Sequence, residues 1–466
     1  MQLNVVPYPS NVVGNSGELL LTLEANVTMD ESAPDSALAL DSLLATLSIV
    51  QSSTASTSIV LSLDGDQVLG AEGYSLTIDD NIAIHAATDA GLFYGVQTLR
   101  QLLPATARDS YTLPHVDITD TPAYPWRGSM LDVARNFMPL DYLKQHVDRM
   151  ALFKLNRLHL HLTDDQGWRL EIKSWPNLTI VGGSTDVFGG HGGFYTQDEM
   201  RELVAYAAQR QVEVVPEIDI PGHTQAALAS YNQLACEDVT NLSTYTGTEV
   251  GFSKLCLTKP DVIYPFVTDV LTEVVGIFPS EYIHIGGDEI KDPLYPEFIE
   301  RADAIVAGLG RKVVAWEEAS AGRMRDSGLV QWWNDGFDLQ PAIDRGNQII
   351  LSPCTYTYFD HGNYEGQPGT QEWGRAEGVP LERVYSLNPQ SHSSAIGVEG
   401  AVWSETVEST EAADNRLWPR MAAIAELGWS TEGNRDYGQF TRRLGALRGH
   451  FDAMRIAYYA EPQLGW

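Results

Sequence analysis

Two adjacent carboxylates, Asp288 and Glu289, follow a short apolar stretch and two glycines in residues 284–289. Successive side chains of a β-strand point to opposite sides, so both acids can face one site only if the backbone turns there. Glycine permits such a turn and allows another group to approach closely. If one acid stays ionised while the other carries a proton, the pair suits acid catalysis. The alternative is a strand end whose acids cap the next helix.

Eight β-type runs alternate with amphipathic helical patterns from residue 126 onward. They span residues 129–134, 157–162, 212–218, 282–285, 312–316, 329–333, 348–351 and 395–403, and a helical segment near 411–427 closes the series. Eight strand–helix repeats predict an α/β fold, a (β/α)₈ TIM barrel over residues 121–466. A doubly wound open sheet is the alternative, but no glycine-rich phosphate loop follows the first strand.

The first 120 residues have a different pattern. Short alternating strands (19–23, 58–63 and 74–78) surround two helical patterns near 36–47 and 90–103. No cluster of ionisable residues with an obvious chemical role is found there. The pattern predicts a small α+β accessory domain over residues 1–120, and residues 117–125 are expected to be the linker.

Barrel enzymes build their active sites at the carboxyl ends of the strands. The predicted strand ends carry carboxylates, histidines, one arginine and aromatic residues. They are Asp132, Arg135, His159, His161, Asp164, Asp165, Trp168, Glu217, Asp219, His223, Asp288, Glu289, Trp316, Glu317, Trp333, Tyr356, Tyr358, Asp360, Trp403 and Glu405. Core packing alone does not explain so many such residues at one pole of a barrel.

Two chemistries fit this set. His159 and His161 lie on one face of a strand, with His223 and His284 on neighbouring strands, which would suit metal-dependent hydrolysis. However, three strands end in tryptophan rather than in further ligands, and histidines in a barrel strand are usually satisfied by hydrogen bonds. Aromatic walls with carboxylates and arginine suit a sugar, whose rings present apolar faces and radial hydroxyls. The chain is therefore expected to hydrolyse glycosides without a metal or other cofactor.

Ordinary glycosidases place their two carboxyl groups across the scissile bond from each other. Asp288 and Glu289 do not obviously span a sugar ring in that way. This indicates a variant in which the substrate supplies its own nucleophile.

The motifs resemble those of family 20 glycoside hydrolases, the β-N-acetylhexosaminidases. Residues 284–289 look like the active-site motif of that family, and the resemblance extends over 126–135, 158–169, 216–223 and 397–405. It covers essentially the whole barrel with four further motifs in the right order. Residues 91–99 are similar, more weakly, to the accessory domain of the family.

The resemblance implies an exo-acting, retaining enzyme that removes terminal GlcNAc or GalNAc through an oxazolinium intermediate. Glu289 would protonate the leaving oxygen and then activate water, while Asp288 would hold the acetamido N–H. His223 and Asp219 would tune Glu289, with Asp164 beside them. A disaccharide-releasing relative and a sugar-binding barrel without catalysis are the alternatives.

The resemblance also implies a substrate-binding set. Arg135, Glu405 and Asp360 would bind sugar hydroxyls, and Tyr358 would hydrogen-bond the acetamido oxygen. Trp316, Trp333 and Trp403 would form the walls of the acetamido pocket. Two choices stay open, because Trp332 adjoins Trp333 and because Tyr356 and Tyr358 share one face of an extended segment.

Composition narrows the remaining questions. A net charge of -32 over 466 residues argues against nucleic acid and anionic membranes as partners. Cys236 and Cys256 bracket a polar loop, and the resemblance implies a disulfide between them and therefore secretion, with a cytoplasmic location as the alternative. The expected partners are β-N-acetylhexosaminide oligosaccharides or glycoconjugates, bound by a monomer or homodimer.

Overall fold

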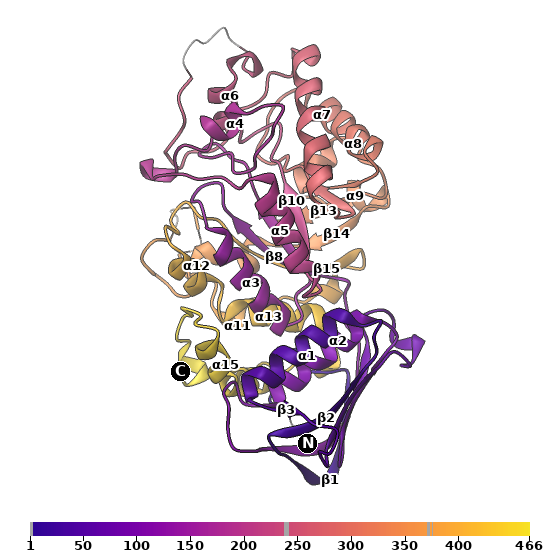
Figure 1. Ribbon diagram of the computed structural model, residues 1–466. Helices are drawn as coiled ribbons and strands as arrows, with labels where there is room; N and C mark the ends of the chain where they lie inside the picture. The colour runs from indigo at the N-terminus through magenta and orange to yellow at the C-terminus, as the bar shows by residue number, and fades with distance from the viewer. Residues whose placement is uncertain (1–2, 237–241, 371–372, 375) are drawn as a thin grey trace.

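The N-terminal domain is a seven-stranded sheet with two helices on the face turned towards the barrel (Figure 1). The computed structural model describes residues 3–236, 242–370, 373–374 and 376–466. The strand order is β1-β7-β5-β6-β4-β2-β3. The elements are β1 Asn11–Leu21, β2 Glu24–Met29, α1 Pro34–Leu47, β3 Val50–Gln51, β4 Ser58–Ser62, β5 Tyr74–Ile78, β6 Ile82–Ala86, α2 Asp89–Leu102 and β7 Tyr111–Asp120.

The expected linker is partly a strand. Residues 117–120 belong to β7, where they pair with β1 on one side and with β5 on the other. The β-branched residues Ile118 and Thr119 favour this extended backbone. The linker expected over 117–125 therefore shortens to residues 121–125, and the first barrel strand begins at Trp126.

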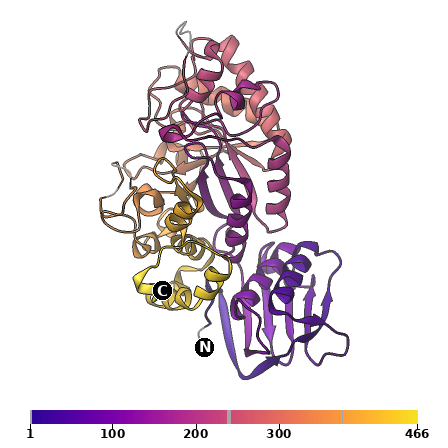
Figure 2. The ribbon, with the colours of Figure 1, turned by 60° about the vertical axis from the view of Figure 1, so that its left-hand side comes forward.

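The second domain is a closed barrel of eight parallel strands, as the sequence predicted (Figure 2). Each strand pairs with its neighbours in chain order, and β15 closes the barrel against β8. The strands are β8 Trp126–Asp132, β9 Arg157–His161, β10 Glu213–Glu217, β11 Tyr282–His284, β12 Lys312–Trp316, β13 Leu329–Trp332, β14 Gln348–Leu351 and β15 Ala395–Val402. Each coincides with one of the eight expected runs.

The helices around the barrel depart from the expected pattern in two places. The connection from β12 to β13 carries only a 3₁₀ segment, Glu317–Ala321, so one of the eight repeats lacks its α-helix. The single helix expected near 411–427 is two helices, because Pro419 has no N–H to continue the first one. The α-helices are α3 Leu140–Leu152, α4 Asn177–Ile180, α5 Gln197–Ala208, α6 Gln225–Ser230, α7 Pro260–Ile277, α8 Tyr295–Gly308, α9 Gln340–Asp344, α10 Cys354–Thr357, α11 Leu381–Tyr385, α12 Thr410–Leu417, α13 Arg420–Trp429, α14 Tyr437–Ala446 and α15 Arg448–Ala453.

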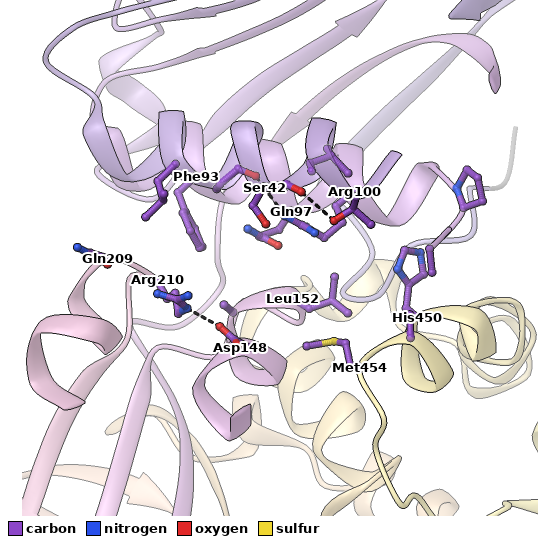
Figure 3. Close-up of a pocket in the computed structure, with 18 residues that line it drawn as sticks. Ser42, Phe93, Gln97, Arg100, Asp148, Leu152, Gln209, Arg210, His450 and Met454 are labelled. Atoms are coloured by element: carbon purple, nitrogen blue, oxygen red, sulfur yellow. Dashed lines mark hydrogen bonds and ion pairs between the residues drawn. The ribbon is translucent and has the colours of Figure 1, made fainter. Parts of the chain in front are cut away.

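Two ion pairs, each with a buried cation, join the two domains at the amino end of the barrel. Lys154 lies 3.0 Å from Asp120, and Arg127 lies 2.5 Å from Glu72. A cavity of about 310 Å³ lies between α1 and α2 on one side and α3 and α15 on the other (Figure 3). None of the strand-end acids lines this cavity, so it is a feature of the domain junction.

Within the described residues, no helix has the length and apolar character needed to cross a bilayer.

Candidate active site

The backbone after β11 makes a left-handed turn. Gly286 and Gly287 have φ angles of +65° and +92°, and Glu289 has +56°. A Cβ atom on Gly286 would lie 1.9 Å from Oδ1 of Asp219, and the N–H of Gly287 donates to that same oxygen at 3.1 Å. The turn therefore depends on glycine, both for its left-handed conformation and for its close approach to Asp219.

The turn brings both adjacent acids against one imidazole. Nε2 of His223 lies 3.5 Å from Oδ2 of Asp288 and 3.5 Å from Oε2 of Glu289. The Asp288 side chain is 12% exposed, whereas that of Glu289 is 32% exposed. Asp288 thus lies deeper, and Glu289 faces the mouth of the site.

The carboxyl groups of Asp219 and Asp288 lie together beside His223, each with an oxygen atom within 4.8 Å of the other. Burial raises the pKa of Asp219 well above its usual value, and the negative charge of Asp288 raises it further. The pKa of Asp288 is also raised, first by burial, although the facing His223 lowers it. Two negative charges this close in a buried site repel each other, so the pair retains a proton to higher pH than either carboxyl group would alone.

Arg135 holds a second group of acids together. Its Nη2 lies 2.8 Å from Oδ2 of Asp164, and its Nη1 lies 3.3 Å from Asp132 and 3.8 Å from Glu405. Its guanidinium carbon lies 5.1 Å from the ring centre of Trp403, a cation–π distance. Burial and the nearby charges of Asp132 and other acids raise the pKa of Glu405 to about 7, although Arg135 lowers it.

A cavity of about 250 Å³ opens at the carboxyl ends of the strands. Its lining combines these charged groups with four aromatic rings. The lining residues are Arg135, His223, Thr248, Val250, Asp288, Glu289, Trp333, Tyr358, Trp373, Trp403 and Glu405. Trp333 and Tyr358 stack with their planes 13° apart, and Tyr358 meets Trp403 edge to face. Flat apolar walls beside carboxylates and a guanidinium fit a sugar ring.

Two family models match the chain on either side of the domain junction. The model for "Glycosyl hydrolase family 20, catalytic domain" matches residues 124–297 and 292–432, and the model for "Glycosyl hydrolase family 20, domain 2" matches residues 2–121. The chain belongs to glycosyl hydrolase family 20.

Individual relatives agree with this assignment. The chain is 36% identical to a β-N-acetylhexosaminidase of Cellulomonas fimi, over 99% of this chain and 97% of the relative. It superposes on the β-N-acetylhexosaminidase of Streptomyces coelicolor A3(2) with a TM-score of 0.92 and 39% identity, covering 99% and 98% of the two chains. The chain also superposes on a mutant Streptomyces plicatus β-hexosaminidase in complex with GlcNAc, with a TM-score of 0.92 and 38% identity. That match covers 99% of this chain and 97% of the other. This family 20 chain is a glycoside hydrolase of the β-hexosaminidase type.

The structure brings most of the predicted site residues together around the cavity. The two open choices are decided by the lining, which includes Trp333 and Tyr358 but not Trp332 or Tyr356. The indole of Trp332 instead donates to the backbone oxygen of Asn334. The ring of Tyr356 lies 4.5 Å from the guanidinium carbon of Arg383.

Four predicted residues lie behind the lining rather than on it. Trp316 is 1% exposed, and its indole donates to Glu217. Asp360 is fully buried, accepts a hydrogen bond from the backbone of Trp403, and has its pKa raised by burial to about 7. Asp164 and Asp219 are also buried. The predicted sugar contacts of Trp316 and Asp360 stay predictions.

Sequence reasoning missed four residues of the site. Thr248, Val250 and Trp373 come from long loops, where no periodicity indicates which side chain turns inward. Glu318 accepts hydrogen bonds from the indole of Trp333 and from the backbone of Glu289, and burial with the charge of Asp288 raises its pKa to about 7. A signal for Glu318 was available, because it is the second of two adjacent acids at a strand end.

A disulfide closes the loop that carries Thr248 and Val250. Cys236 and Cys256 are bonded, as the family resemblance implied. Their separation of 20 residues brackets both lining positions. The bond therefore limits the freedom of one wall of the cavity, as well as that of the unfolded chain.

Replacement of Gly286 by alanine should abolish the site geometry. The added Cβ would meet Asp219, and alanine disfavours the positive φ by about 1 kcal/mol before any clash. We expect at least about a 100-fold loss of kcat, because a small misplacement of catalytic groups has effects of this size. Gly276→Ala is the matched control, since Gly276 is in α7 with nothing within 4 Å of its added Cβ. Equal activities of the two variants would contradict the role of the turn.

Removal of the disulfide should weaken substrate binding more than turnover. Changing both Cys236 and Cys256 to serine should lower the free energy of unfolding by about 3 kcal/mol, as expected for a loop of this length. KM should rise, because the loop that carries Thr248 and Val250 becomes freer, while kcat changes less. Dithiothreitol should reproduce the effect in the wild type and have none in the double variant. An unchanged KM would show that the loop needs no such restraint.

Proposed function

We propose that this enzyme cleaves terminal β-linked GlcNAc or GalNAc by substrate-assisted catalysis with retention of configuration. The acetamido carbonyl oxygen of the substrate attacks C1, the bond from C1 to the leaving oxygen breaks, and an oxazolinium ion forms. Water then attacks C1 from the side of the departed group. The nucleophile belongs to the substrate, so the protein needs one acid–base residue and one residue that supports the acetamido group.

The adjacency of Asp288 and Glu289 against one histidine is the observation that carries this proposal. Both carboxylates lie 3.5 Å from Nε2 of His223, so they meet at one imidazole rather than facing each other across a sugar. An ordinary retaining pair needs two carboxyl groups about 5 Å apart on opposite sides of C1. The observed arrangement favours a mechanism in which only one of the two handles the leaving group.

Exposure and charge support the division of roles. Glu289, the more exposed acid, protonates the leaving oxygen and then takes a proton from the attacking water. Asp288, the buried and ionised one, accepts a hydrogen bond from the acetamido N–H and stabilises the positive charge of the oxazolinium ion. Asp219 keeps Asp288 in place while carrying the shared proton.

The lining suggests how a single sugar is held. Tyr358 donates to the acetamido oxygen, and Trp333 and Trp403 enclose the acetamido group with Trp316 behind them. Arg135 and Glu405 take the hydroxyls on the other side of the ring. Asp360 supports the backbone of Trp403 and contributes to the same end of the cavity.

The substrate supplies the first test. A chromogenic β-GlcNAc should be hydrolysed, whereas the matching β-glucoside should not, because it lacks the 2-acetamido nucleophile. Measuring kcat/KM for both under the same conditions gives the result directly. Similar values for the two substrates would contradict substrate assistance.

Replacement of Glu289 by glutamine gives the second test. Glutamine keeps the shape but cannot donate the proton, so kcat/KM should fall by about 10² to 10⁴ for a leaving group that needs protonation. A strongly acidic leaving group departs without help, so its loss should be smaller. Glu300→Gln, an exposed position on α8, is the control and should leave both rates unchanged. The same loss for all leaving groups would argue against the acid role.

A further inference from the structure

A chain of hydrogen-bonded charged residues runs through the barrel interior to the two acids at the end of β11. In order, its members are Glu399, His159, Glu217, His161, Asp164 and His223. The successive contacts are 2.8, 3.0, 2.6, 2.8 and 3.2 Å, and the last imidazole lies 3.5 Å from Asp288 and from Glu289. All six residues are at most 4% exposed.

The alternation of β-strands explains how these residues meet on the barrel axis. His159 and His161 are two residues apart on β9, so both point inward. Glu217 ends β10 in register with His161 and accepts from both imidazoles through one oxygen, Oε2. Glu399 points inward from β15 and packs against Gly128 of the neighbouring strand β8. A Cβ atom on Gly128 would lie only 2.1 Å from Oε2 of Glu399, so glycine leaves the space for this carboxylate.

The charges along the chain alternate in sign. Burial disfavours charge on His159 and His161, but the carboxylates on either side raise the pKa of His159 to about 9 and that of His161 well above its usual value. Burial likewise opposes the charge on the two carboxylates, Glu217 and Asp164. The pKa of Glu217 is nevertheless held low by His284, His161 and His159. The pKa of Asp164 is held low by Arg135 and His223. The pKa of His223 is well above its usual value, because Asp164, Asp288 and Asp219 outweigh its burial.

We propose that Glu217 is a positioning residue for the reaction, acting through His161, Asp164 and His223 on the charge of Asp288. This inference rests on the proposed function, because it is Asp288 that must be ionised to support the acetamido group. Glu217 touches no substrate, since it lies below the lining of the cavity. Its effect is transmitted by the ordered, alternating contacts and by its own negative charge.

Glu217 also acts directly on the neighbouring carboxyl groups of the site. Its negative charge raises the pKa of both Asp219 and Asp288. The other titratable or charged groups that interact with Asp288 are Asp219, His223, Glu289, Glu318, Tyr295 and Tyr358. Of these, only His223 is cationic. Removal of the nearby negative charge of Glu217 should therefore lower the pKa of Asp288 measurably.

A stabilising role alone does not account for this arrangement. Buried ion pairs are often no more stabilising than apolar residues of similar volume. The neighbouring barrel positions of the interior are apolar, for example Val215 and Val314, so apolar filling was sterically possible there. The chain of charges, by contrast, ends at the catalytic pair.

Glu217→Gln tests the inference, because it removes the charge and keeps the shape. Asp288 must be ionised for turnover, and its pKa should fall when the neighbouring negative charge is lost. The acid limb of the kcat/KM profile should therefore move to lower pH. At pH values where Asp288 is already ionised, kcat should still fall by about 2- to 30-fold with little change in KM, because the neutral amide holds His161 and, through Asp164, His223 less firmly in place.

Two further variants make the test specific. Glu399→Gln removes the charge at the far end of the chain and should move the acid limb in the same direction by a smaller amount. It also serves if Glu217→Gln does not fold. Glu426→Gln is the matched control, because Glu426, in α13, is equally buried and pairs with Arg443 of α14, away from the site. It should lower stability without moving the profile.

Each outcome has one meaning. A shifted acid limb in the Glu217 and Glu399 variants, but not in the Glu426 variant, supports the inference. Profiles identical to that of the wild type, with activity lost only in proportion to folded protein, overturn it. Failure of the proposed function is recognised separately, as equal wild-type turnover of β-GlcNAc and β-glucoside substrates.

Discussion

The left-handed turn from Gly286 to Glu289 is the constraint on which the rest of the site depends. Without it, the side chains of residues 288 and 289 would point to opposite sides of an extended backbone. With it, both reach His223 at the same distance. The turn is fixed by the hydrogen bond from Gly287 to Asp219 and by the hydroxyl of Tyr295, which donates to the backbone oxygen of Gly287. Asp219 thus serves both the backbone and the charge of the site.

The site contains more buried carboxylates than cations, and this imbalance determines where its protons reside. Arg135 and His223 are the two cations in the cavity lining. They keep the pKa of Asp164 low, while burial and the charges of neighbouring acids raise the pKa of Asp219 and Glu405, and burial raises that of Asp360. Protons held on such groups near neutral pH avoid the cost of several buried negative charges. The acid–base behaviour of the site is therefore a property of the whole cluster.

The strands and their polar ends could be predicted from the sequence because both depend on local pattern. The eight barrel strands follow runs of apolar residues, and a parallel barrel collects its strand ends at one pole. The division between Trp332 and Trp333 could not be predicted, because it depends on where β13 ends and the loop begins. Trp373 also lay beyond prediction, since its loop has no periodicity and reaches the cavity only through tertiary contacts.

The expected interior histidines also show how far local reasoning extends. Alternation placed His159 and His161 inside the barrel, but their partners Glu217 and Glu399 come from other strands. Those pairings follow from the stagger of the closed barrel rather than from any single segment. The sequence of one strand does not show how that strand is aligned with the others in the closed barrel, so these pairings could not be predicted.

The charged chain on the barrel axis is enclosed by apolar groups at both ends. Below it, Trp126, Val215, Val314, Leu329 and Ile350 form a buried cluster. Above it, Met130, Trp316, Tyr358, Ala401 and Trp403 form another, on which the cavity opens. Water is therefore excluded from the contacts between them, and electrostatic interactions are stronger in such an environment than in water. The main hydrophobic core lies outside the barrel, between its strands and helices. Stability therefore does not require apolar side chains at every interior position, and charged residues can occupy the axis up to the catalytic pair.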